Sequence, residues 1–514
     1  MSRADDSGPR HEYWKYSMSS RDMLKMLLFT SLIICCQTAI AERGMSRSDD
    51  AQSPNVVVFY VDDLGYGDLS SYGHPVVKTP HIDQLANEGI KYTQYYAPAP
   101  LCSPSRAGLL TGRTPYRTGI RSWIPEGQDV YLGKNEITIA HLLKQQGYAT
   151  AVMGKLHLNG GMHMEEHPQT EDMGFDYAFV MPGGFVKNST VEAPSSDGSA
   201  RVGKMYPDNY FRNGLAVGET NAFSGELVAN EVIKWLETKR ADTPFFLYVP
   251  FSEVHTPVAS TPEFLTMYAE FITPHAKTNP DIFHWDWLDL PSRGQGEYYA
   301  NISYLDAQVG KVIKKLKDMG VYDQTIVLFT SDNGPVTRES RKPWELFMAG
   351  ETGGYRGRKD NLLEGGIRVP AILRYPSAIA PGSVSNEPVY GLDILPTLLE
   401  MLGIELPEGR VIDGQSITKT FEGRELDRKP MIWTIDMPGQ DDDVNEWAYR
   451  VGDNKLILDR NEVPKFLFNV SKDPYEMVNL VNKEKDLLAR LEEQFQILRA
   501  EIEADPVNRT VEHD

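Results

Sequence analysis

The chain has 514 residues, of which 41% are hydrophobic and 24% charged, a composition typical of a large globular protein with a sizeable core. Its formal net charge of −20 argues against nucleic acid and against an anionic membrane surface as partners. Three cysteines are too few for a cysteine-rich metal site.

The first 41 residues have the pattern of a secretory signal peptide. Arg21 and Lys25 precede an apolar stretch over residues 26–36, and the small-residue pattern Ala39-Ile40-Ala41 follows it. The apolar stretch is too short to predict a membrane span. We therefore expect cleavage near Ala41, export to the periplasm or out of the cell, and no stable membrane anchor.

Cleavage would leave Cys102 as the one cysteine of the mature chain, because Cys35 and Cys36 lie within the apolar stretch. An internal disulfide is then excluded. The basic lead-in before the stretch is unusually long. Three methionines are therefore candidates for the first residue: Met1, Met18 and Met23.

Apolar runs alternate with amphipathic stretches over most of the chain. The predicted strands, where β-branched and aromatic residues cluster, cover residues 55–61, 149–153, 245–251 and 325–330. The predicted helices cover residues 79–89, 138–146, 225–238 and 302–316. This alternation predicts an α/β fold, with a large domain built on a mostly parallel, mixed sheet flanked by helices.

Several polar residues follow these strands, at the edge of the sheet where ligands of open parallel sheets bind. They are Asp62 and Asp63 after the first strand, Gly154-Lys155-Leu156-His157 after the second, His255 after the third, and Asp332 and Asn333 after the fourth. We therefore expect residues far apart in the sequence to meet at one site.

The pattern changes near residue 426. Short strands are predicted at 447–451 and 455–459, and Gly452-Asp453-Asn454 between them is typical of a hairpin. A charged helix near 484–503 follows. We predict a smaller C-terminal subdomain (426–514) with a short antiparallel sheet and a helix, after the signal peptide (1–41) and the large domain (42–425).

The run from Cys102 to Arg113 reads Cys-Ser-Pro-Ser-Arg-Ala-Gly-Leu-Leu-Thr-Gly-Arg. It resembles the signature of the sulfatase family, Cys-x-Pro-x-Arg followed by a short helix that ends in Thr-Gly-Arg. The resemblance implies that a maturation enzyme oxidises Cys102 to formylglycine, whose hydrate has one hydroxyl to attack sulfur and another to help release sulfate. A small buried core cysteine is the alternative, disfavoured because polar and turn-forming residues flank Cys102.

The resemblance extends from Asn55 to about Leu402, and more weakly from Leu467 to the C-terminal helix. It implies that the large domain is the catalytic one and that its fold is similar to that of alkaline phosphatase.

Asp62, Asp63, Asp332 and Asn333 offer three carboxylates and one amide, oxygen donors that suit a hard divalent cation. Capping or solvation explains most isolated Asp-Asp pairs, but here two polar pairs each end a predicted strand. The family places one calcium ion (Ca2+) there and adds the modified residue 102 to its ligands. The implied metal ligands are Asp62, Asp63, Cys102, Asp332 and Asn333.

Arg106 lies near the start of the signature helix, and the resemblance implies that it orients the aldehyde hydrate; a surface arginine is the alternative. The N-terminal amides and dipole of that helix favour an anion beside residue 102. Gly154-Lys155-Leu156-His157 resembles the family's Gly-Lys-x-His element, in which the lysine contacts sulfate and the histidine takes a proton from the second hydroxyl. Histidine titrates near neutrality, which suits that step.

His255 lies in a run, residues 253–257, that resembles the family's His-x-Pro after an apolar strand. Lys359 precedes Glu364-Gly365-Gly366-Ile367-Arg368, and both pieces resemble a sulfatase element. The resemblance implies that His255 and Lys359 bind sulfate and that His255 protonates the leaving oxygen; a structural histidine is the alternative. The implied catalytic residues are Cys102, Arg106, Lys155, His157, His255 and Lys359.

These features predict an exported, calcium-dependent sulfatase acting on a sulfated carbohydrate, with an arylsulfatase for small substrates as the nearest alternative. The preference for a carbohydrate rests on export and on long segments between the motifs, at 158–221, 259–296 and 335–354. Residues in these segments are candidates for the substrate rim, with loop-anchoring or surface roles as the alternatives: Phe283, Trp285, Trp287, His163 and His167.

Two further classes of protein stay open. One is a phosphoester or phosphonate-ester hydrolase of the same superfamily, although such relatives commonly carry Asp-His where this chain has Asp332-Asn333. The other is a catalytically inactive carbohydrate-binding protein on the same scaffold. The complete set of implied catalytic residues argues against it.

Overall fold

The computed structural model describes residues 53–505 apart from 163, 165, 184–206, 241, 256–257, 259, 272–293, 337–349 and 437–444. The signal peptide expected at 1–41 lies outside the described residues, as do the rim candidates His163, Phe283, Trp285 and Trp287. Among the helices that are described, none combines the length and the apolar character needed to cross a membrane.

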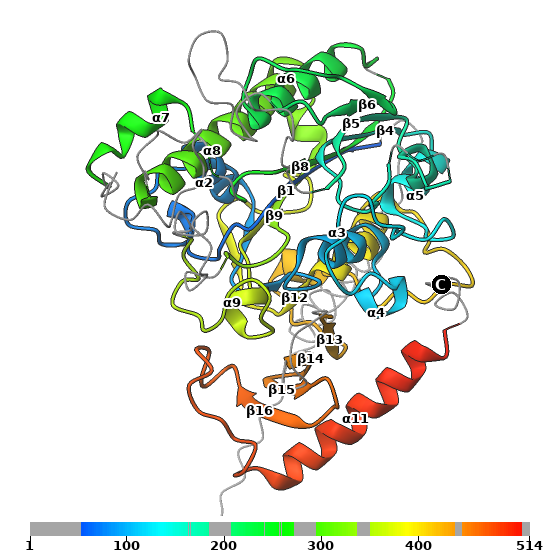
Figure 1. The fold of residues 1–514 in the computed structure, drawn as a ribbon, viewed down its shortest axis with the longest axis vertical. Helices are drawn as coiled ribbons and strands as arrows, with labels where there is room; N and C mark the ends of the chain where they lie inside the picture. The colour runs from blue at the N-terminus through cyan, green and yellow to red at the C-terminus, as the bar shows by residue number, and fades with distance from the viewer. Residues whose placement is uncertain are drawn as a thin grey trace, which may run out of the picture. The chain divides into compact units, whose positions relative to one another are not determined.

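A mixed sheet of ten strands forms the centre of the described chain, in the order β11-β2-β10-β9-β1-β8-β4-β5-β6-β7 (Figure 1). Its middle strands are parallel: β9 (Thr325–Ser331), β1 (Asn55–Val61), β8 (Phe245–Phe251), β4 (Ala149–Lys155) and β5 (Tyr177–Met181). Antiparallel pairs occur toward both edges, among β10 (Ala371–Arg374), β2 (Ile90–Tyr92), β6 (Phe211–Arg212) and β7 (Leu215–Ala216). The outermost strand, β11 (Ser383–Ser385), pairs parallel with β2. The predicted mostly parallel, mixed sheet is confirmed.

Helices cover both faces of this sheet, which explains why β1 is apolar from Val56 to Val61 rather than alternating. Val57, Phe59 and Val61 share a core with α2 (Pro80–Glu88), α6 (Ser224–Glu237) and α8 (Gly294–Asp318). Figure 1 shows these three helices together on one side of the central strands. The alternate residues of β1 face α3 (Cys102–Thr111), α5 (Ile139–Gln145) and α10 (Ile394–Leu402).

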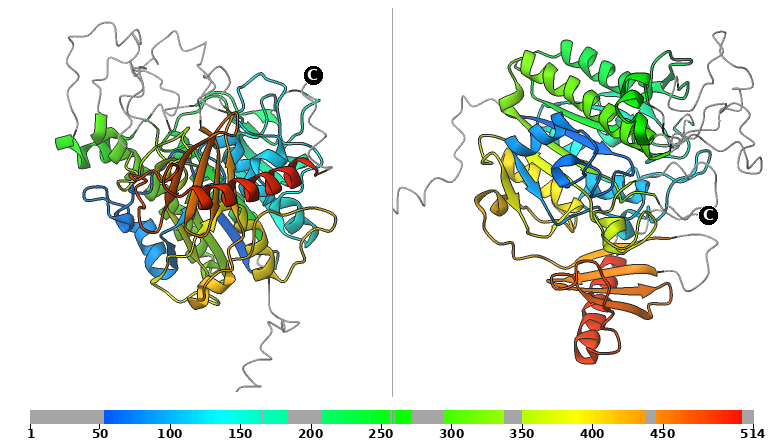
Figure 2. Two further views of the ribbon diagram at one scale, coloured as in Figure 1. Left: turned by 90° about the horizontal axis from the view of Figure 1, so that it is seen from below. Right: turned by 90° about the vertical axis from the view of Figure 1, so that its left-hand side faces the viewer.

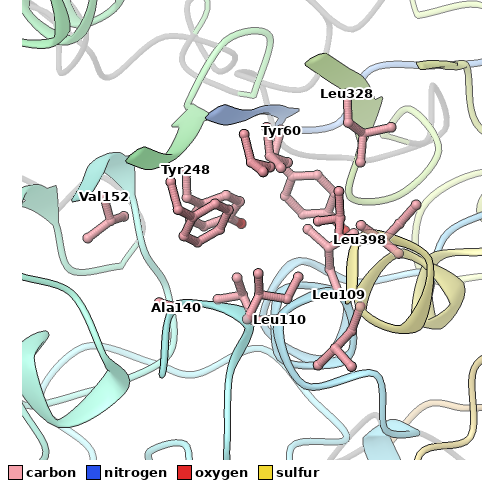
Figure 3. Packing of buried hydrophobic residues seen from close by; sticks show 14 of the residues in the cluster. Tyr60, Leu109, Leu110, Ala140, Val152, Tyr248, Leu328 and Leu398 are labelled. Carbon is pink, nitrogen blue, oxygen red and sulfur yellow. The ribbon is translucent and has the colours of Figure 1, made fainter. Parts of the chain in front are cut away.

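The core on the α3 side of the sheet packs directly against the helix that carries the signature. Figure 3 shows Tyr60 and Tyr248 of the sheet facing Leu109 and Leu110 of α3, with Leu398 of α10 beside them. All five side chains are at most 2% exposed, and burying a side chain of this size contributes roughly 1.5–3 kcal/mol. The apolar residues Leu109 and Leu110 therefore anchor α3 to the sheet. The first turn of α3, which carries Cys102, is not needed for this packing.

The strand predicted at 149–153 extends two residues further, to Lys155, which pairs with Met181 of β5. Gly154 allows this extension. A Cβ atom at position 154 would lie 2.0 Å from the carbonyl oxygen of Pro250, and the residue has φ +133°. Only glycine tolerates that approach, so the first residue of the Gly-Lys-x-His element is required by the backbone.

The C-terminal part forms a separate antiparallel sheet in the order β13-β14-β15-β16, as predicted. Its elements are β13 (Met431–Thr434), β14 (Asn445–Val451), β15 (Asn454–Asp459), β16 (Pro464–Asn469) and the helix α11 (Lys485–Glu503). Figure 2 shows α11, in red, along one face of this sheet, where Phe495 packs on Trp447 and Tyr449. On the other face, Trp433 packs against Tyr96 and Tyr390 of the large domain.

Candidate active site

The parallel register brings the predicted strand-end residues together. Val61 pairs with Ser331 of β9 and with Phe251 of β8, so the residues that follow these strands emerge side by side. The amide of Asp63 donates to Oδ1 of Asp332 at 3.1 Å, and Nδ2 of Asn333 donates to Oδ1 of Asp63 at 2.7 Å. The four predicted oxygen donors therefore form one cluster.

Cys102 joins this cluster as the first residue of α3. Its Sγ lies within 4.8 Å of one carboxylate oxygen each of Asp62 and Asp332. It also lies within 4.8 Å of a carboxylate oxygen of Asp63 and of a ring nitrogen of His255. Leu101 before it is extended and makes no side-chain cap, and Pro104 in the first turn has no N–H that would need a partner. The first turn of α3 thus places residue 102 beside the cluster at the positive end of the helix dipole.

Arg106 lies behind the carboxylates and is fully buried, which excludes the surface alternative. Its Nε and Nη2 donate to Oδ2 of Asp332 at 3.1 and 2.7 Å, and its Nη2 lies 3.3 Å from Oδ1 of Asp62. Its Nη1 donates to the carbonyl oxygen of Lys155 at 2.5 Å. In this structure Arg106 therefore orients the carboxylates and β4.

Two lysines also contact the carboxylates of the cluster. Nζ of Lys155 donates to Oδ2 of Asp62 at 2.7 Å, and Nζ of Lys359 donates to both oxygens of Asp63 at 2.7 and 2.9 Å. Nζ of Lys359 also lies 3.4 Å from Sγ of Cys102. The formal charges of the three cations and the three aspartates cancel, so this site is far less negative than the chain as a whole.

His157 follows β4 in a left-handed conformation with φ 56°, uncommon for a residue other than glycine. Its Nε2 lies 3.0 Å from the carbonyl oxygen of Ile124, which can only accept, so Nε2 carries the proton. Its Nδ1 is buried and has no hydrogen-bond partner in the described part of the chain. Burial, together with the charges of Lys155 and Arg106, holds the pKa of His157 well below its usual range. Neutral His157 therefore presents an unprotonated Nδ1.

His255 stands at the more open side of the site, with its side chain 22% exposed and Nε2 3.6 Å from Oδ2 of Asp63. Burial lowers the pKa of His255 to about 4, although Asp63 acts in the opposite direction. The pKa of His255, like that of His157, therefore lies below the near-neutral value of an ordinary histidine. Both are neutral at pH 7 because desolvation outweighs the nearby carboxylates.

The pKa values of the acidic groups at the site are shifted in different directions. Burial would raise the pKa of Asp62, but Lys155, His255 and Arg106 outweigh it and hold the pKa well below its usual range. For Asp332, burial and the charge of Asp62 raise the pKa to about 7, although Arg106 opposes them. Burial raises the pKa of the Cys102 thiol to about 12 despite Lys155 and Lys359. An unmodified Cys102 is therefore a protonated thiol at neutral pH and a poor nucleophile.

The cluster fits a hard divalent cation. Its donors are carboxylate and amide oxygens, as calcium prefers. Oδ1 of Asn333 is buried without a hydrogen-bond partner among the residues that the structure describes, and Oδ1 of Asp62 has only the 3.3 Å ion-pair contact with Arg106 and no hydrogen bond. Buried polar atoms are rarely left in this state, and a bound cation would satisfy both.

The comparisons with known proteins agree with this geometry. The sulfatase family model matches residues 54–404, and a model of the C-terminal region of N-sulphoglucosamine sulphohydrolase matches residues 350–501. The chain belongs to the sulfatase family. It is a sulfuric ester hydrolase, and the predicted alkaline-phosphatase-like fold is confirmed.

This sulfatase is similar to several relatives along most of its length. It is 33% identical to rat steryl-sulfatase over 72% of this chain and 70% of the relative, and 31% identical to human arylsulfatase A over 88% and 89%. An N-acetylgalactosamine-6-O-sulfatase of Bacteroides thetaiotaomicron is 28% identical over 93% and 98%. Among solved structures, Ps i-CgsB in complex with k-i-k-neocarrahexaose has a TM-score of 0.71 and 26% identity, covering 87% of this chain and 93% of that one.

The fold is also shared with a different enzyme class. A phosphonate monoester hydrolase of Agrobacterium radiobacter has a TM-score of 0.63 at 22% identity, covering 87% of this chain and 96% of that one, a likeness of fold alone.

Sequence reasoning missed a residue that contacts two site elements through its backbone. The amide of Ile124 donates to Oγ of Ser103 at 3.1 Å, and its carbonyl oxygen accepts from His157. Backbone contacts leave no residue-type signal, so no motif indicates position 124. His167, considered for the rim or the surface, is buried: its Nδ1 contacts Oδ1 of Asn159 at 2.8 Å and its Nε2 contacts Oδ1 of Asp129 at 3.0 Å. His167 anchors a loop.

A second missed feature is a buried ionic cluster between the C-terminal sheet and the segment that carries Lys359. Nζ of Lys455 on β15 lies 3.0 Å from Glu364 and 2.9 Å from Glu476, and the amide of Glu364 donates to Glu476 at 2.7 Å. All three side chains are 0% exposed. The cluster therefore fixes the start of α9 (Glu364–Ile367), five residues after Lys359.

Proposed function

We propose that this sulfatase hydrolyses a sulfate ester on a sulfated carbohydrate after export from the cell, using formylglycine at position 102 and one calcium ion. The observation that carries the proposal is the position of Cys102. It begins α3 next to the carboxylates of Asp62, Asp63 and Asp332 and 3.4 Å from the ammonium group of Lys359. A buried thiol with a raised pKa is a poor nucleophile. A residue at this position would therefore need conversion by a maturation enzyme before it could attack the sulfate ester.

Four oxygen-donor residues and residue 102 would hold the calcium ion: Asp62, Asp63, Asp332, Asn333 and Cys102. When present, formylglycine supplies a hydroxyl nucleophile as its hydrate, and calcium supplies charge neutralisation for the nucleophile and the sulfate oxygens. The charges of the chain's own site residues cancel, so a divalent cation makes the site net positive. This resolves how a chain with a net charge of −20 can bind an anionic substrate.

The cationic side chains bind and orient the sulfate group. Lys155 and Lys359 each hold a carboxylate here, and their ammonium groups can exchange it for a sulfate oxygen. The N-terminus of α3, which begins at residue 102, adds backbone amides. Arg106, fully buried and bound to Asp332, keeps the carboxylates in place while these contacts change.

The two histidines have different proton roles. His157 holds its proton on Nε2 against Ile124, which leaves Nδ1 to accept a proton from a hydroxyl of residue 102. His255 lies on the more open side and is assigned to the leaving oxygen, to which its protonated Nε2 would donate. An anion bound beside His255 favours that protonated form.

The carbohydrate assignment is supported by relatives whose names specify sugars, among them the N-acetylgalactosamine-6-O-sulfatase and the enzyme solved with neocarrahexaose. A panel of substrates tests it: oligosaccharides of chondroitin 6-sulfate and of κ-carrageenan, with 4-nitrophenyl sulfate and 4-nitrophenyl phosphate as controls. We expect hydrolysis of a sulfated sugar and loss of all turnover in Cys102→Ala. Faster turnover of the phosphate than of every sulfate ester would instead support the phosphohydrolase alternative.

A further inference from the structure

Trp123 is the exception among the tryptophans that the structure describes. Its side chain is 51% exposed, whereas Trp235, Trp433 and Trp447 are at most 5% exposed. No ring or cation–π contact to Trp123 exists among the described residues. A large aromatic surface is thus left in contact with water rather than packed in the core.

The backbone on the C-terminal side of Trp123 is tied to the catalytic elements. Ile124 is 1% exposed, its amide donates to Ser103 next to Cys102, and its carbonyl oxygen holds His157. One peptide unit therefore separates Trp123 from a residue bonded to both the signature helix and the proton-accepting histidine.

The backbone on the N-terminal side is tied to the C-terminal sheet. The carbonyl oxygen of Arg121 accepts from the amide of Asp436 at 2.9 Å, and its guanidinium lies 3.4 Å from Asp436 and from Glu446. The same guanidinium lies 5.3 Å above the ring of Tyr116. Trp123 is thus presented by a loop that is fixed at both ends, which limits the entropy lost when a ligand covers the ring.

The chemistry around Trp123 suits a sugar better than a protein partner. Protein interfaces need a broad patch, and Trp123 is the one exposed large hydrophobic residue in the described part of 100–210. Its neighbours Ser122 and Glu126 are polar. The C–H face of a pyranose is apolar and its rim is polar, so a single indole between polar groups can stack on it.

We propose that Trp123 forms a sugar-binding subsite of this enzyme, stacking on the pyranose that carries the ester while the sulfate occupies the lysine-lined cluster. The proposal rests on the carbohydrate function proposed above. It makes Trp123 a residue that sets the preference for a sugar as the leaving group.

The test compares Trp123→Ala, Trp123→Leu and Trp123→Phe with the wild-type enzyme on oligosaccharides of chondroitin 6-sulfate and κ-carrageenan. We expect Trp123→Ala and Trp123→Leu to raise KM for the cleaved oligosaccharide about 10-fold with kcat nearly unchanged, because stacking contributes to binding rather than to chemistry. Trp123→Phe should restore most of the binding. Leu215→Ala, which removes another exposed apolar side chain on the edge strand β7, is the matched control.

Inhibition by inorganic sulfate separates the subsite from the anion site, because sulfate has no leaving group to stack. Its inhibition constant should be the same in all Trp123 variants. An unchanged KM in Trp123→Ala, or a restored KM in Trp123→Leu, overturns the stacking role while the carbohydrate function stands. Failure of the wild-type enzyme to cleave any sulfated glycan while it cleaves 4-nitrophenyl sulfate overturns the carbohydrate function itself.

Discussion

Nζ of Lys359 lies 3.4 Å from Sγ of Cys102 and at the same time binds both oxygens of Asp63. Burial would lower the pKa of Lys359, but Asp63 outweighs it and raises the pKa well above its usual range. Lys359 is therefore a permanent cation beside the predicted nucleophile. This is the position from which an ammonium group can neutralise a sulfate oxygen.

Lys359→Ala should reduce kcat/KM by about 10²–10³-fold, the typical loss when one charge-stabilising donor is removed. Since the lysine acts on the anion rather than on the leaving group, the loss should be similar for a glycan sulfate and for 4-nitrophenyl sulfate. Steady-state kinetics on both substrates measure it. Lys472→Ala, at an exposed lysine in the turn after β16, controls for the change in net charge and should leave both values unchanged.

His255→Ala should discriminate between the same two substrates. A sugar hydroxyl is a poor leaving group and needs a proton as the S–O bond breaks, so its turnover should fall by about 10²–10⁴-fold. Nitrophenolate leaves without help, so turnover of 4-nitrophenyl sulfate should fall by much less. Equal losses on both substrates would reassign His255 to sulfate binding.

Removal of calcium should abolish activity, and added calcium should restore it, because without the ion the charges of the site residues only cancel and the nucleophile and sulfate oxygens lose their charge neutralisation. Calcium should also raise the melting temperature, since a ligand that binds only the folded state stabilises it. Asp332→Asn keeps an oxygen that can accept a hydrogen bond from Arg106 but removes one negative charge from the site. This variant should lose the calcium-dependent rise in melting temperature; an undiminished rise would exclude Asp332 as a ligand.

The buried cluster around Lys455 predicts a pH dependence of stability. Burial raises the pKa of Glu476 to about 6, although Lys455 opposes it. Between about pH 4.3, its usual value, and pH 6, the folded state keeps a proton that the unfolded state loses, so the free energy of unfolding falls as pH rises. The shift corresponds to about 2 kcal/mol. Glu476→Gln should remove this decline. In denaturant titrations, the free energy of unfolding of the variant minus that of the wild type should therefore increase from pH 4.5 to pH 7.

Glu364 in the same cluster provides the contrasting variant. Burial would raise its pKa, but Lys455, Arg368 and Arg450 outweigh it and lower the pKa to about 2. Its contribution to stability is therefore present above about pH 4.3 and is lost only as the pH falls toward 2. Glu364→Gln should destabilise the fold at neutral pH by about 3–5 kcal/mol, because it removes a partner of the buried Lys455. A smaller effect than that of Glu476→Gln at pH 7 would contradict this assignment.

The sequence could predict the centre of the fold because β1 and β8 are continuous apolar runs whose bounds can be read directly. It could place the site because Asp62, Asp332 and the signature cysteine follow motif positions. It could not predict the end of β4, where Gly154 and Lys155 have little strand propensity and the strand continues through pairing with β5. Tertiary context decided that boundary.

Other site features depend on contacts that residue types do not signal. Ile124 acts through its backbone, and Glu476 reaches Lys455 from a left-handed conformation with φ 56° that no turn motif indicates. The pKa values of the histidines also depend on burial that becomes visible only once β4, β8 and α3 have packed. The convergence of these residues was therefore predictable, whereas their environment was not.

The state of residue 102 tests the account most directly. Peptide mass spectrometry of active enzyme, produced in a host that contains the maturation enzyme, should show the aldehyde form at position 102, with specific activity proportional to the converted fraction. Cys102→Ala should keep the wild-type melting profile and lose all turnover, since the residue reacts rather than packs. Full activity from a preparation in which residue 102 is entirely an unmodified thiol would contradict the account.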